Sequence, residues 1–109
     1  MAAQTINLPT QTLTTSAQTS SGLGGLDSTI ALGLITLSTI TSTMGVQVQV
    51  EQTSSGSNWA VLLSGGNTVY ITSGNAIVIN PFPYKQLRFG SSVTEATAIP
   101  VLCSAQFVI

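Results

Sequence analysis

A strict two-residue alternation of apolar and polar side chains at 44–52 (MGVQVQVEQ) restricts the fold of this chain more than any other feature. Val46, Val48 and Val50 fall on one face of an extended strand, and Gln47, Gln49 and Glu51 fall on the other. Side chains in a β-strand point alternately to opposite faces, so the pattern predicts a strand that is buried on one face only. On this pattern, Glu51 is expected to be a solvated surface acid.

The rest of the sequence also favours strands, because Thr, Val, Ile and Ser dominate it. β-Branched side chains lose rotamer freedom in helices and fit pleated sheets. The helix formers Glu, Lys and Arg are nearly absent, since charged residues make up only 5% of the 109 positions. An all-β chain is therefore predicted, with further strands at 28–37, 59–63, 68–72, 76–79, 85–89 and 100–109.

The separators between these runs carry turn chemistry. Gly and Asn tolerate positive φ, so SGGN at 64–67 and SGN at 73–75 predict consecutive antiparallel hairpins between 59 and 79. The segment 80–85 (NPFPYK) differs, because its two prolines lack a backbone donor, and we expect an extended crossover or a sheet edge there. Many short strands without crossover helices indicate an antiparallel β-sandwich or barrel.

Residues 1–20 have a different composition from the rest. They are rich in Thr, Gln and Ser, carry no charge and contain few apolar residues, notably Ile6, Leu8 and Leu13. Two interpretations are open: a frayed terminus with a first edge strand, or an extended arm that adds a strand to a neighbouring subunit. Residues 21–109 are predicted to form one domain.

The scarcity of charge excludes several classes of partner. The formal net charge is −1, and Lys85 and Arg88 are the only cations, too few for a nucleic-acid-binding stripe. The longest apolar run, 30–35, is far shorter than the ~20 residues that span a bilayer. We therefore predict neither nucleic acid nor membrane as a partner. The first residues also lack the pattern of a secretion signal, so export by that route is not expected.

Catalytic chemistry is not indicated either. The sequence has no histidine, which removes the usual general base and the commonest metal ligand. Cys103, the single cysteine, alternates in phase with Val101 and Ala105 and is expected to be a small buried residue rather than a reactive thiol. The carboxylates Asp27, Glu51 and Glu95 lie on separate segments. We predict no enzyme, no metal and no cofactor.

The aromatic residues offer the remaining binding features. Trp59 shares strand phase with Val61 and Leu63, so we expect a core anchor there, with a sugar-stacking ring as the alternative. Phe82 and Tyr84 flank prolines in an irregular segment, and we expect them to face a partner.

The stretch VQVQVEQTSSGSNWAVLL at 46–63 resembles a type of small tailed-bacteriophage virion protein, in which an alternating strand leads through a polar turn to Trp and a second strand. A Pro-aromatic crossover (NPFPYKQLRF, 80–89) and a C-terminal strand (CSAQFVI) follow in the same order, so the resemblance covers 28–109. The neutral turn SSGSN departs from the acidic turn common in such proteins, so an ion-binding turn is not carried over.

This resemblance implies a jelly-roll-like β-sandwich and a structural role in a virion. The expected function is capsid decoration (cement), in which a homo-oligomer, for example a trimer, bridges major capsid subunits on the capsid surface after synthesis in the host cytoplasm. A neck or tail protein and a carbohydrate-binding module are the alternatives. Candidate partner contacts are Ile6, Leu8, Leu13, Tyr70, Phe82, Tyr84, Lys85 and Arg88.

Overall fold

The computed structural model describes residues 3–16, 18–26, 29–41, 45–53 and 55–108. Over these ranges the chain forms ten β-strands and no helix, and every pairing between the strands is antiparallel. The all-β prediction is therefore confirmed. Asp27 lies outside the described residues.

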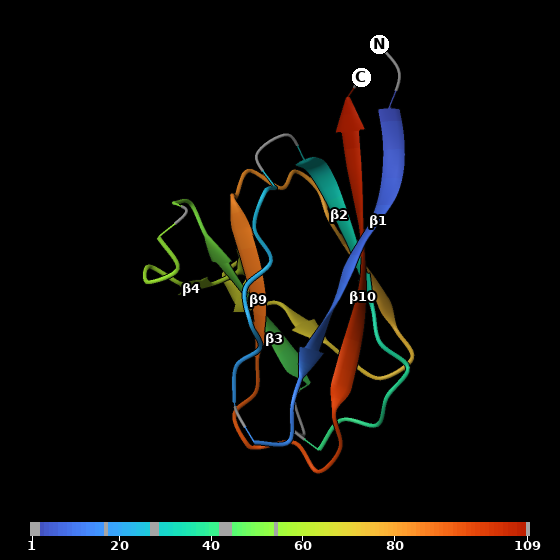
Figure 1. Ribbon diagram of the computed structural model, residues 1–109, viewed down its shortest axis with the longest axis vertical. Helices are drawn as coiled ribbons and strands as arrows, with labels where there is room; N and C mark the ends of the chain where they lie inside the picture. The colour runs from blue at the N-terminus through green and yellow to red at the C-terminus, as the bar shows by residue number, and fades with distance from the viewer. Residues whose placement is uncertain (1–2, 17, 27–28, 42–44, 54, 109) are drawn as a thin grey trace.

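The larger sheet has the strand order β1-β10-β2-β8. Its strands are β1 (Ala3–Leu13), β10 (Ile99–Val108), β2 (Thr29–Ile35) and β8 (Ala76–Ile79). Figure 1 shows β1 and β10 crossing the molecule as one long ribbon, with β2 beside β10. β1 thus forms one edge of the sheet, paired with β10 of its own chain over most of its length with one register shift between Leu8 and Gln11. β8 forms the other edge.

A second sheet is built around β3 (Val46–Glu51), the alternating run. β9 (Gln86–Gly90) pairs with it, and so do β4 (Ala60–Val61) and β7 (Tyr70–Ile71). Residues 18–26 lie along β9, held by bonds such as that from the Leu23 amide to the Leu87 carbonyl (2.8 Å). Figure 1 shows β3, β4 and β9 together, set apart from the β1–β10 ribbon.

Residues of both sheets contribute to one hydrophobic core. Val46, Val48 and Val50 are buried, as the alternation predicts, and Cys103 lies in the same cluster. The other sheet contributes residues such as Leu32 and Leu34, which belong to the same cluster of buried side chains. The burial of one face of β3 therefore follows directly from its sequence period.

The run at 59–79 follows the turn chemistry only in part. β5 (Leu63–Ser64) and β6 (Asn67–Thr68) form the expected hairpin, because Gly65 and Gly66 adopt the positive φ values (60° and 84°) that a tight hairpin turn requires. The second expected hairpin is wrong, since β7 pairs with β3 while β8 pairs with β2 in the other sheet. The segment 80–85 then leads from β8 to β9 in the second sheet, so the predicted crossover is confirmed.

Candidate functional site

Exposed charge is scarcer in the structure than the sequence suggests. Two of the carboxylates, Glu51 and Glu95, are 1% and 2% exposed. Arg88 is half-buried, and Lys85 is the one charged side chain classed as exposed within the described ranges. The described surface therefore consists almost wholly of neutral polar and apolar groups.

Glu51 is an anchor for the turn that follows β3. Its carboxylate accepts hydrogen bonds from the Gly56 amide (2.9 Å), the Asn58 amide (2.7 Å), the Ser55 hydroxyl (3.1 Å) and the Gln86 side-chain amide (2.7 Å). The expected solvated acid is thus wrong. Its side chain does leave β3 on the outer face, opposite Gln86, but residues 55–58 fold over it.

The hydrogen bonds decide the ionisation of Glu51. Burial of the carboxylate opposes its charge, but the amides of Asn58, Gly56 and Ser57 and the Ser55 hydroxyl outweigh burial and lower its pKa below 4.5. Because these neighbours are donors, they stabilise the anionic carboxylate. The geometry assigns Glu51 to holding the turn that follows β3.

Glu95 holds a second loop at a different place. One carboxylate oxygen accepts a hydrogen bond from the Ser91 hydroxyl (2.7 Å), and the other accepts from the Thr41 amide. The Thr41 hydroxyl in turn accepts a hydrogen bond from the Ala96 amide (2.9 Å). These contacts tie residues near 41 to the loop at 91–96, so the second buried carboxylate is also an anchor between loops.

The outer face of β3 and β9 carries a hydrogen-bonded row of polar side chains. The Arg88 guanidinium donates to the Gln49 side-chain oxygen (2.6 Å), and the Gln49 amide donates to Gln47 (2.8 Å). The guanidinium also lies 4.6 Å from the centre of the Trp59 ring, a cation–π distance. Burial lowers the pKa of Arg88, whereas the charge of Glu51 raises it.

Trp59 lies beside Arg88 in this row on the outer face, and not in the core. Its indole nitrogen donates to the Gly56 carbonyl (2.9 Å), and a Cβ at Gly22 would lie 3.1 Å from its ring. Val61 and Leu63, which share its phase, are 40% and 58% exposed. The expected core anchor is therefore wrong, and Leu62, in the opposite phase, is the residue that is buried.

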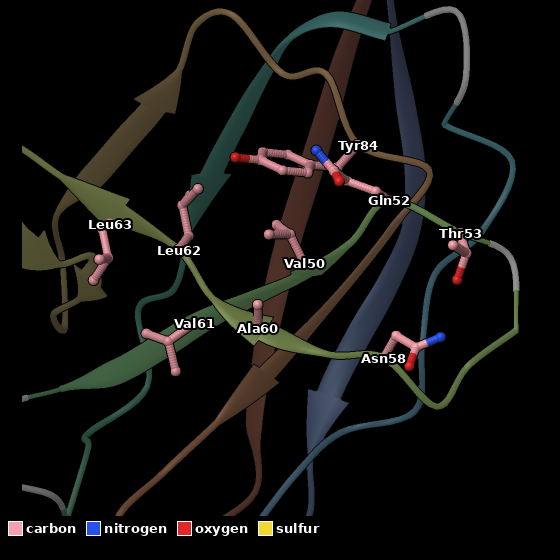
Figure 2. Close-up of a pocket in the computed structure, with 9 residues that line it drawn as sticks. All are labelled: Val50, Gln52, Thr53, Asn58, Ala60, Val61, Leu62, Leu63 and Tyr84. Carbon is pink, nitrogen blue, oxygen red and sulfur yellow. The ribbon is translucent and has the colours of Figure 1, made fainter.

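Two hollows on the surface share part of their lining. The first, about 470 Å³, contacts β3, β4 and Tyr84, and Figure 2 shows Thr53 and Asn58 at one end of it and Leu63 at the other. The second, about 400 Å³, lies beside β8, and we call it the β8 groove. Leu62, Leu63 and Tyr84 line both hollows. The β8 groove is lined by Leu62, Leu63, Ser64, Val69, Ile77, Val78, Ile79, Asn80, Pro81, Pro83 and Tyr84.

The outer face of the larger sheet has a shallower hollow, of about 330 Å³. It lies over Gly33, where the missing side chain leaves Ser104 close to the backbone: a Cβ on Gly33 would lie 2.9 Å from the Ser104 hydroxyl. Val78 and Leu102 rise beside it and are 72% and 53% exposed.

The predicted partner contacts divide into surface and core residues. Leu13 and Phe82 are 0% and 1% exposed, so neither side chain is available to a partner, and the expected exposure of Phe82 is wrong. The Phe82 amide donates to the Ile30 carbonyl (3.0 Å), and this bond holds the segment 80–85 over the core. Of the remaining six, Ile6 and Lys85 are exposed, while Leu8, Tyr70, Tyr84 and Arg88 are half-buried.

The structure brings few of these residues together. Phe82 and Tyr84 make an edge-to-face ring contact with centres 5.4 Å apart. Ile6 and Leu8 lie on β1, at the edge of the larger sheet opposite β8. The β8 groove and the Trp59–Arg88 row are the features that sequence reasoning missed, because each depends on strands joined only in the folded chain.

The described residues contain no group of three or more His, Cys, Asp or Glu side chains able to hold a metal. Burial raises the pKa of the Cys103 thiol to about 11, against a weaker effect of the Gln11 backbone, so the thiol is protonated at neutral pH. The described residues form no helix that is long and apolar enough to cross a membrane. Comparison with protein-family models, curated proteins and solved structures finds no significant match.

Proposed function

We propose that this chain is a non-enzymatic structural protein of a bacteriophage virion, a jelly-roll-like β-sandwich that decorates the capsid and bridges its major subunits as a homo-oligomer. The sequence resemblance supports this role. The observation that carries it is the charge of the surface, because the described residues present Lys85 as their one exposed charged side chain.

A neutral surface suits a permanent assembly. Ordinary soluble domains carry about 25% charged residues and use them to keep sheet edges apart. The cores of protein interfaces, in contrast, are depleted of charge. Burial of Glu51 and Glu95 removes two of the five charged side chains from the surface. Covering the neutral faces with companion subunits accounts for a composition that would leave an isolated monomer prone to association.

The decisive experiment adds the purified chain to undecorated heads of the phage that encodes it. Binding to the assembled shell stabilises it by mass action, so we expect the heads to melt at a higher temperature. Protein carrying Phe82→Ala, which removes a core ring, serves as a poorly folded control. Unchanged melting of the heads would exclude the cement role, and averaged electron micrographs of whole particles would then test the neck and tail.

A carbohydrate-binding module remains the second candidate, because Trp59 lies outside the core beside hydrogen-bonding side chains. The Arg88 guanidinium lies over its ring and donates to Gln49, so polar groups able to bind a sugar lie near an aromatic side chain. A glycan array with the native chain and with Trp59→Ala tests this function. Binding that disappears in a folded Trp59→Ala variant would support it, and an array without binding would exclude it for the glycans displayed.

A further inference from the structure

The β8 edge of the larger sheet lacks most of the usual protection against pairing. β8 (Ala76–Ile79) ends the order β1-β10-β2-β8 and pairs only with β2 among the described strands. In an antiparallel pair, alternate residues direct their backbone N–H and C=O groups away from the partner strand. Natural edges are blunted by charge, proline, a bulge or a very short strand. The sequence AIVI has no charge or proline and pairs with β2 in register without a bulge, so its short length of four residues is the one such device that β8 itself has.

The β8 groove opens beside this edge. Ile77 and Ile79 of β8 contribute to it, and so do Leu62 and Val69, which lie between the short strands β4 to β7. Ile77 and Ile79 are half-buried against the core, whereas Val78 points outward. A strand added along β8 would direct every second side chain toward the groove and the others toward the outer face.

The chemistry of the edge determines what can occupy it. The residues that line the β8 groove include no charged side chain, so a strand carrying charge on its inner face would lose hydration without gaining a partner. An uncharged, apolar extended segment therefore fits this edge better than an average stretch of a soluble protein, in which about a quarter of residues are charged. This chain supplies such a segment in β8 itself.

We propose that β8 pairs antiparallel with β8 of a second copy of this chain across a two-fold axis. Pairing centred on Val78 places Ile77 opposite Ile79 of the second copy, so apolar side chains of both copies meet over the joined grooves. The two larger sheets then form one continuous sheet, with the contact isologous as a two-fold axis requires. The inference rests on the proposed function in one respect, namely that the chain self-associates.

Lysine at the edge tests the pairing. We expect the native chain to sediment as a dimer, or as a larger even-numbered oligomer, at micromolar concentration. Val78→Lys places a charge at the edge, where Val78 is 72% exposed and the fold does not need it. We expect at least a tenfold weaker association for this variant, with an unchanged urea midpoint at concentrations where both chains are monomeric. Leu102→Lys is the matched control, because Leu102 is 53% exposed on the same face but lies on an inner strand.

A disulfide provides a second, geometric measurement. Val78→Cys should cross-link two copies under mild oxidation, since residues directly opposite in an antiparallel pair have Cβ atoms near disulfide distance. Leu102→Cys should not cross-link, and the native thiol of Cys103 is buried. A dimer that forms through Val78→Cys and not through Leu102→Cys would support the register.

Several outcomes would overturn the pairing while leaving the virion role open. These are a native trimer, equal association of Val78→Lys and native protein, or loss of association in both lysine variants, which would indicate face packing instead. A native chain that stays monomeric at high micromolar concentration would also overturn it. Binding to phage heads is measured separately, so a monomer that still stabilises heads would refute the pairing alone.

Discussion

Replacing Phe82 with Ala tests whether its ring is a core residue, as the structure indicates, or a partner contact, as the sequence pattern indicates. The structure buries the ring to 1% exposure and sets it edge-to-face against Tyr84, whereas the flanking prolines suggest a ring that faces a partner. Phe82→Ala should therefore damage the fold of each chain. If the ring were a surface contact, the variant would keep its stability and lose only association.

The expected magnitude is large. Replacing a buried Phe by Ala typically costs about 3–5 kcal/mol of unfolding free energy. Loss of the ring contact with Tyr84 is part of this cost or adds slightly to it. A chain of 109 residues has a total stability of about 5–16 kcal/mol. Since 1 kcal/mol shifts the melting temperature of a domain this small by about 4–8 °C, we expect a decrease of more than about 12 °C.

Urea unfolding followed by circular dichroism measures this loss, at two protein concentrations so that association and folding are separated. A core defect lowers the midpoint at both concentrations. Leu37→Ala is the control, because Leu37 is 76% exposed and its truncation should cost less than about 0.5 kcal/mol. A loss below about 1 kcal/mol for Phe82→Ala, together with weaker association, would refute the structural interpretation.

Three further predictions concern the buried groups and one turn. Because the pKa of Glu51 is lowered in the folded chain, its ionised carboxylate stabilises the fold above pH 4.5, and this contribution is lost as the pH falls through the lower folded pKa. Glu51→Gln should therefore flatten the acid side of a plot of unfolding free energy, measured in urea, against pH. Identical plots for the two chains would contradict this. Gly45→Ala should lower the unfolding free energy by at least about 2 kcal/mol, because φ is 106° and the new Cβ would lie 2.7 Å from the Ile71 carbonyl oxygen. Gly65→Ala, whose Cβ meets open space, should lower it by about 1 kcal/mol. Similar urea midpoints for the two variants would count against this geometry. Cys103, with its pKa raised to about 11, should react with a thiol reagent only as fast as the chain opens, and rapid labelling of the folded protein would exclude its burial.

The sequence predicts local geometry well where period and turn chemistry decide it. The alternation at β3 correctly identifies its buried face, and SGGN correctly predicts the β5–β6 hairpin. SGN at 73–75 fails to predict the partner of the next strand, because a turn sets a change of direction and not which strand pairs next. β7 and β8 consequently lie in different sheets.

The errors at the candidate site arise from contacts between segments far apart in the chain. The alternation places Glu51 on the outer face, as observed, but cannot show that residues 55–58 fold back over it. Alternation gives two faces without saying which is inner, so it places Trp59 on the wrong face, and Leu62 is the residue that enters the core. Phe82 lies in an irregular segment, where no period exists to predict burial.

The effect of salt on association between copies of the chain distinguishes a neutral interface from one held by ion pairs. Because the described surface carries so little charge, we expect only a small effect. Attraction between exposed charges weakens as the Debye length shortens, from about 10 Å at 0.1 M to about 3 Å at 1 M salt. The described surface offers only Lys85 and the half-buried Arg88 to such an effect, so association should weaken less than about threefold between 0.1 M and 1 M NaCl. Sulfate should strengthen it, because excluded salts favour burial of apolar area. Sedimentation velocity across this range measures both effects. A tenfold weakening in NaCl would mean that ion pairs hold the copies together, which neither the β8 edge nor the neutral faces can provide.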